Sequence, residues 1–93
     1  MRLKEKEITT IKSTIAEVFG EATIYLFGSR LDLSKKGGDI DLFIIPKNKN
    51  NLFEKKIKAL ARLKMRLFKP VDIVTHKDFN RAIEQEALKG KVL

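Results

Sequence analysis

The stretch LFGSRLDLSKKGGDIDLFII, residues 26–45, places two aspartates two positions apart, directly before a run of apolar residues. Side chains alternate across a β-strand, so Asp39 and Asp41 are expected on one face of a strand that continues to Ile45. A charged side chain beside a protein core is costly unless something compensates the charge. The stretch therefore predicts a core strand whose first residues carry carboxylates that need a counter-charge.

Two further stretches are typical of β-strands. Residues 23–27 form a β-rich run that ends at Gly28, and residues 71–75, with the sequence VDIVT, form another. The strand between them is expected over residues 40–45, because Pro46 cannot continue the hydrogen-bond ladder. The last three residues, KVL, could add a short fourth strand.

Three segments show the apolar periodicity of amphipathic helices. The first covers residues 4–19 and is expected to end at Gly20, a typical C-cap residue. The second covers residues 52–68 and ends before Pro70. We expect its core-facing side chains to be Phe53, Ile57, Leu60, Leu63 and Leu67.

In the third helical segment, Asp78 is expected to cap a helix that runs to about Lys89. Its inward-facing residues are predicted to be Phe79, Ile83 and Ala87. The order of elements is therefore helix, strand, turn, strand, helix, strand, helix. This order indicates an α/β (α+β) fold with a small mixed sheet of three to four strands flanked by helices.

The composition indicates one water-soluble domain, residues 1–93. The formal net charge is +8, which suits nucleic acid, nucleotide phosphates or an acidic protein, although Lys-rich helix faces can also serve solubility alone. The chain has no cysteine, which excludes disulfides, thiolate zinc sites and cysteine catalysis. No membrane-length apolar run and no signal peptide are present, so a cytoplasmic location without membrane contact is expected.

A third acid, Asp72, interrupts the apolar residues of VDIV. If its strand lies next to the 40–45 strand, Asp39, Asp41 and Asp72 can converge on one divalent cation, because residues two apart in a strand are roughly 6 to 7 Å apart. Oxygen-only ligands favour Mg²⁺ or Mn²⁺ over Zn²⁺. In the simpler alternative Asp39 caps the preceding glycine turn and Asp41 faces solvent. The acid on a second strand favours the metal site.

The turn Gly28-Ser29 follows one strand and is separated from Asp39 by a nine-residue spacer. Backbone N–H groups and a hydroxyl at such a turn can bind phosphate oxygens, and glycine lets phosphates approach the backbone closely. Arg30 could add a phosphate contact or could be a surface cation, and the sequence favours neither. The order strand, glycine turn, paired aspartates therefore indicates a site for a phosphorylated ligand and a cation.

The motifs LFGSR, GGDIDLFI and VDIV together resemble the catalytic core of the DNA polymerase β-like nucleotidyltransferase superfamily over about residues 8–88. The small size points to its minimal nucleotidyltransferase (MNT) group. The resemblance implies that Gly28 and Ser29 hold the triphosphate of an NTP, and that Asp39 and Asp41 bind two Mg²⁺ (or Mn²⁺) ions. It also implies that Asp72 is the third carboxylate and helps to activate the attacking hydroxyl.

Two departures from the family pattern accompany the resemblance. The spacer is slightly shorter than in many members, which bears little on the site. These 93 residues also contain no second domain that would recognise a base or an acceptor, so the acceptor stays open.

The resemblance implies a metal-dependent enzyme that moves NMP, most simply AMP from ATP, to a hydroxyl of a protein or RNA partner. Proteins of the MNT group are often antitoxins of HEPN-domain toxins, so such a toxin as partner, in an oligomer or hetero-complex, is also implied. The main alternative is a non-catalytic binding module that neutralises a toxin or binds RNA. A D-x-D glycosyltransferase is a third candidate, but that class needs far longer chains.

Other residues are assigned structural positions. His76, the only histidine, is predicted to cap the third strand at the surface. Tyr25 and Phe27 are predicted to be core residues rather than a base-stacking platform. The basic face of the second helix could bind RNA, but aromatic side chains are not interleaved with its cations.

Overall fold

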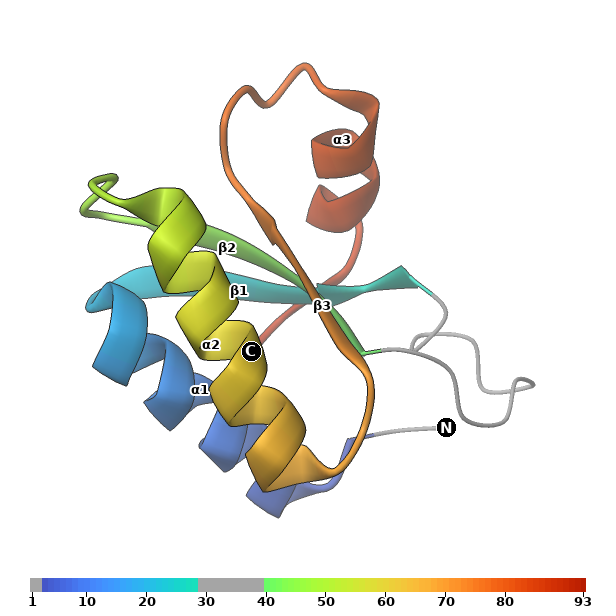
Figure 1. Cartoon of the computed structure of the whole chain (residues 1–93). Coiled ribbons are helices and arrows are strands. Elements are labelled where there is room, and N and C mark those ends of the chain that lie inside the picture. The colour runs from blue at the N-terminus through green and yellow to red at the C-terminus, as the bar shows by residue number, and fades with distance from the viewer. Residues whose placement is uncertain (1–2, 29–39) are drawn as a thin grey trace.

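The computed structural model describes residues 3–28 and 40–93. The elements are α1 (Glu5–Phe19), β1 (Ala22–Phe27), β2 (Ile40–Pro46), α2 (Leu52–Leu67), β3 (Val71–Thr75), α3 (Ala82–Leu88) and β4 (Lys91–Val92). The strands form one sheet in the order β3-β2-β1-β4 (Figure 1). β1 pairs antiparallel with β2 and with β4, whereas β2 and β3 are parallel. The predicted α+β fold with a mixed sheet is confirmed, with four strands.

The main core lies between the sheet and the two long helices. Parallel strands need a crossover connection, and α2 provides it between β2 and β3, packing beside α1 (Figure 1). Ile40, Leu42 and Ile44 alternate along β2 and point into this core. The buried members from the helices are Ile11, Ile15 and Phe19 of α1 and Ala59, Leu63 and Leu67 of α2.

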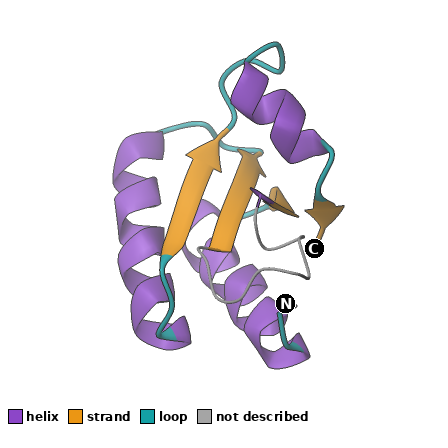
Figure 2. Cartoon of the chain, turned by 90° about the vertical axis from the view of Figure 1, so that its right-hand side faces the viewer, coloured by secondary structure: helices purple, strands orange, loops and turns teal. Residues whose placement is uncertain are grey.

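A smaller apolar cluster covers the other face of the sheet, on the side of α3. Figure 2 shows the strands between α2 and α3. Phe27 and Phe43 are buried here against Ala87, and Tyr25 packs against them while partly exposed. The prediction of a core position is therefore confirmed for Phe27 and holds in part for Tyr25. This second face is the one on which the odd-numbered residues of β2 lie, and it therefore also carries Asp41.

The predicted core face of α2 is partly wrong. Phe53 and Ile57 are 72% and 52% exposed, although both were expected to face the core. Ala59, Leu63 and Leu67 are buried instead, with Leu60 packed partly against them. The helix carries apolar residues on two arcs, and the arc that contains the small Ala59 lets α2 approach the sheet closely. Periodicity alone does not distinguish these two arcs.

The start of α3 also differs from the prediction. The helix begins at Ala82, because Asp78 accepts a hydrogen bond from the backbone N–H of Asn80 (2.9 Å) and forms a turn instead of a cap. The N-cap is Arg81, in extended conformation. Phe79 and Ile83 are 46% and 41% exposed rather than inward-facing, whereas Ala87 is buried as expected.

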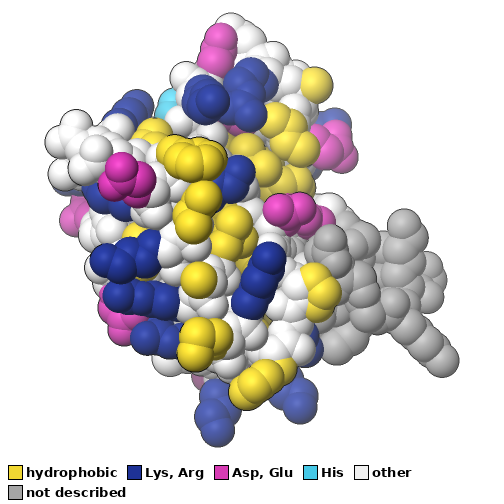
Figure 3. All heavy atoms as spheres, in the orientation of Figure 1, with side chains coloured by type: hydrophobic (Ala, Val, Ile, Leu, Met, Phe, Trp, Pro, Cys, Tyr) yellow, Lys and Arg dark blue, Asp and Glu magenta, His cyan; other side chains and the backbone are white. Residues whose placement is uncertain are grey.

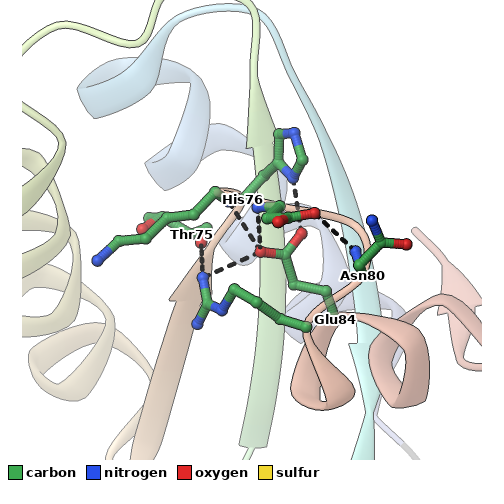
Figure 4. A network of polar contacts seen from close by, with 7 residues as sticks. Thr75, His76, Asn80 and Glu84 are labelled. Carbon is green, nitrogen blue, oxygen red and sulfur yellow. Dashed lines mark hydrogen bonds and ion pairs between the residues drawn. The ribbon is translucent and has the colours of Figure 1, made fainter.

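His76 is buried rather than at the surface, and its partner is Glu84, whose side chain is inaccessible. Figure 4 shows the two side chains pointing toward each other, with His76 Nδ1 2.6 Å from Glu84 Oε1. Glu84 Oε2 accepts hydrogen bonds from the backbone N–H groups of Lys77 (2.8 Å) and Asp78 (2.9 Å) and from Arg81 (2.9 Å). Glu84 therefore fixes the loop between β3 and α3.

No helix in the described part of the chain combines the length and apolarity that crossing a membrane would require.

Candidate active site

Asp41 and Asp72 lie side by side on neighbouring strands. They are register partners in the parallel pairing of β2 and β3, so their Cα atoms are about 5 Å apart across the sheet. Both project from the same face of the sheet as Phe43 and Val74, which follow them two residues later on β2 and β3. Asp41 is half-buried and Asp72 is exposed. The predicted metal site required the strand of Asp72 to lie next to the strand of Asp41, and this pairing of β2 with β3 is confirmed.

Gly28 lies directly against the Asp41 carboxylate. The register of β1 and β2 pairs Phe27 with Asp41, so β1 ends where the carboxylate begins. Gly28 has φ +78°, a backbone conformation that side-chain-bearing residues rarely adopt, and a Cβ atom there would overlap Asp41 Oδ2. Glycine is therefore required here for two reasons: the turn needs a positive φ, and the Asp41 carboxylate occupies the space that a Cβ atom would fill.

The remaining predicted site residues, Ser29, Arg30 and Asp39, lie outside the described residues. Within residues 3–28 and 40–93, no group of three or more His, Cys, Asp or Glu side chains is arranged to hold a metal ion. The described part of the site is therefore the pair Asp41 and Asp72 with Gly28 beside it.

The chemistry of this pair fits a divalent cation. Two like charges opposite each other on paired strands disfavour the fold. A bound cation would attract both carboxylates and so turn this repulsion into a net attraction. The side chains of Asp41 and Asp72, which are the described acids at this end of the two strands, offer carboxylate oxygens, the ligand type that Mg²⁺ and Mn²⁺ prefer. The exposure of Asp72 leaves the pair accessible to a ligand from solvent.

A mixed four-stranded sheet with acids paired on neighbouring strands, faced by a glycine turn, has the architecture of a nucleotidyltransferase catalytic domain. Residues 9–93 match the family described as polymerase beta, nucleotidyltransferase, and the chain belongs to this family. The resemblance of LFGSR, GGDIDLFI and VDIV to this superfamily is thereby confirmed. No curated protein matches the chain at a significant level.

The sequence predicted only part of the role of Gly28. Its place after a strand predicted a phosphate-binding turn, but its contact with Asp41 depends on the pairing of β1 with β2. A glycine at the end of a strand that pairs antiparallel with a D-x-D strand is the signal that would have revealed the contact.

Gly28→Ala is expected to abolish activity, and Gly20→Ala provides the matched control. Both glycines have positive φ, +78° and +76°, so an alanine strains the backbone at either position. At Gly20, however, a Cβ meets no atom within 4 Å. We therefore expect both variants to lose thermal stability but only Gly28→Ala to lose nucleotidyl transfer. Equal activity in the two variants would show that the space beside Asp41 is not needed.

Proposed function

We propose that the protein is a divalent-metal-dependent nucleotidyltransferase that transfers NMP, with ATP as the first candidate donor, to a hydroxyl of a partner molecule. The observation that carries the proposal is the register of β2 and β3, which sets Asp41 beside Asp72 at the end of β1. Membership of the nucleotidyltransferase family supports the reaction class. In this proposal Asp39 completes the metal-binding carboxylates, and Ser29 and Arg30 join Gly28 at the triphosphate.

A bound Mg²⁺ or Mn²⁺ pair would neutralise the charge of the triphosphate and of the leaving pyrophosphate. The residues of the chain position the reactants, which is the main source of catalysis in phosphoryl chemistry. Asp41, half-buried and packed against Gly28, would have a fixed carboxylate orientation. Gly28 would let the phosphates approach the backbone next to that carboxylate.

Asp72 is proposed to accept the proton of the attacking hydroxyl, because it is the more exposed acid of the pair. The hydroxyl oxygen then forms a bond to the α-phosphorus. The bond from the α-phosphorus to the bridging oxygen breaks, and pyrophosphate leaves with the electron pair. The products are the nucleotidylated acceptor and pyrophosphate.

The acceptor is proposed to come from another molecule. We propose a HEPN-domain toxin as the acceptor and partner, with the present protein as its antitoxin, and RNA as the second candidate acceptor. The net charge of +8 would speed the encounter with an acidic segment of either kind.

The proposal is tested by incubating the protein with Mg²⁺, the candidate partner and ATP labelled at either the α- or the γ-phosphate. Nucleotidyl transfer should put the α-label, and not the γ-label, on the partner. A binding module that neutralises the partner without chemistry would restrain it equally well and transfer no label from any NTP. That second result would refute the enzyme and support the module.

A further inference from the structure

α2 presents an apolar stripe to solvent, on the side of the helix that faces away from the core. The stripe consists of Phe53, Ile57, Ala61 and Met65, which recur every four residues, and of Phe68 directly after the helix. Phe53, Met65 and Phe68 are 72%, 75% and 88% exposed. Figure 3 shows hydrophobic side chains running down this face of the molecule, with Lys and Arg side chains beside them. Contiguous exposed apolar surface of this kind is typical of interaction sites.

The charges on α2 have one sign. The helix contains six Lys and Arg residues but a single acid, Glu54. Two of the cations, Arg62 and Arg66, pair with Glu17 of α1. The four lysines of the helix are Lys55, Lys56, Lys58 and Lys64. None of them forms an ion pair with another residue that the structure describes. The stripe is therefore bordered by cations that are available to an external anion.

A basic pocket lies at the N-terminal end of the stripe, between α2 and the segment that follows β3. Phe53 and Lys56 line it from α2, and Lys77 and Arg81 line it from the other side. Glu84 and the backbone carbonyl of Thr75 hold Arg81 in place, at 2.9 and 3.5 Å. The volume of about 170 Å³ is below the roughly 300 Å³ at which small-molecule sites usually begin, so the pocket suits an acidic side chain better than a nucleotide.

Phe68 has a backbone conformation that an aromatic residue adopts at a cost. It is the C-cap residue of α2 and has φ 55° in the left-handed region, where glycine or asparagine is usual. Its ring is 88% exposed and gains almost no burial within the chain in return. A ring that a partner covers would account for a phenylalanine at this position.

We propose that α2 is the docking surface for an acidic amphipathic helix of a partner protein. The apolar side of that helix would cover Ile57 and Met65, and its carboxylates would face Lys58 and Lys64 and enter the basic pocket. A second copy of this chain fits poorly, because it would bring the same lysines together. RNA fits less well than protein, because Ile57, Ala61 and Met65 offer no ring on which a base could stack.

This inference stands independently of nucleotidyl transfer. α2 packs on the face of the sheet opposite to that from which Asp41 and Asp72 project. A partner bound to α2 would therefore leave the two carboxylates accessible, and variants in the stripe should not alter the site itself.

The proposal is tested with a synthetic helical peptide that carries Leu at four-residue intervals and Glu on both flanks. Fluorescence anisotropy should show that it binds at least tenfold more tightly than the same peptide with Lys in place of Glu. Ile57→Glu should weaken binding at least tenfold. Val92→Glu should not, because Val92 is similarly exposed, 54% against 52%, but lies on β4 at the edge of the sheet opposite to β3.

Phe68→Gly separates binding from folding. Glycine relieves the left-handed backbone, so the melting temperature should stay the same or rise, while affinity for the acidic peptide falls several-fold. Equal affinity for the Glu and Lys peptides, or equal losses in Ile57→Glu and Val92→Glu, would overturn the proposal. So would dimers in ultracentrifugation that Ile57→Glu dissociates, or single-stranded RNA that binds more tightly than the peptide.

Discussion

Asp72→Asn is expected to lower NMP transfer by at least about 100-fold, because the amide cannot accept the proton of the attacking hydroxyl. ATP binding in the presence of Mg²⁺ should be retained, since Asp41 and the other proposed ligands stay in place. The free energy of unfolding should not fall, and could rise by up to about 1 kcal/mol, because the variant removes one of two like charges on paired strands. Transfer of α-labelled ATP and chemical denaturation measure the two effects.

Asp78→Asn is the matched control for this substitution. It makes the same change in charge six residues further along, at an exposed position beyond the opposite end of β3, and its side-chain oxygen can still accept from Asn80. Transfer by Asp78→Asn should equal that of the wild type. If Asp72→Asn kept full activity, or if it unfolded far more easily than the wild type, Asp72 would be a structural residue and not the proposed base.

Glu84→Ala is expected to reduce the free energy of unfolding by about 3 kcal/mol, although Glu84 has no part in the proposed chemistry. The substitution leaves two backbone N–H groups and His76 without their buried partner. Glu86→Ala is the control on the same helix, because the Glu86 side chain is 69% exposed and its contact with Lys89 is a surface pair. Urea denaturation of both variants should show a large loss only for Glu84→Ala. Equal losses would mean that the buried network contributes little.

The same carboxylate predicts a pH dependence. Burial raises the pKa of Glu84, but hydrogen bonds from His76, Asp78 and Lys77 together with the charge of His76 outweigh it and lower the pKa from 4.5 to about 2. The contribution of Glu84 to stability is therefore complete above pH about 4.5 and is lost as the pH falls toward about 2. The stability difference between wild type and Glu84→Gln should shrink over this range. A difference that stays constant would show that the pKa of Glu84 is not lowered.

The strands and the described part of the site could be predicted from local sequence. Asp41 starts an apolar run that Pro46 ends, and Asp72 interrupts another, so both strands and their alternation followed from residues within a few positions of each other. The sequence could not predict that β2 and β3 are neighbours, because their pairing depends on the crossover through α2. Asp39, Ser29 and Arg30 stay predictions, since they lie outside the described residues.

The errors have a common cause in contacts between different elements of the fold. Glu84 has the sequence appearance of a surface residue on a short helix, and only its approach to His76 makes it a buried carboxylate. Phe53 and Ile57 match a core-facing arc as well as Leu63 does, and the sheet decides which arc is covered. Local periodicity identifies such helices but does not choose between two apolar faces.

Calorimetric titration of ATP into the protein, with and without Mg²⁺, tests most directly the claim that the carboxylates hold a divalent cation for a nucleotide. It requires no knowledge of the acceptor. Because carboxylates repel a triphosphate unless cations lie between them, ATP should bind at least tenfold more tightly with Mg²⁺, and Asp41→Asn should remove most of that difference. Equal affinity for ATP with and without Mg²⁺ in the wild-type protein would contradict the proposed metal site.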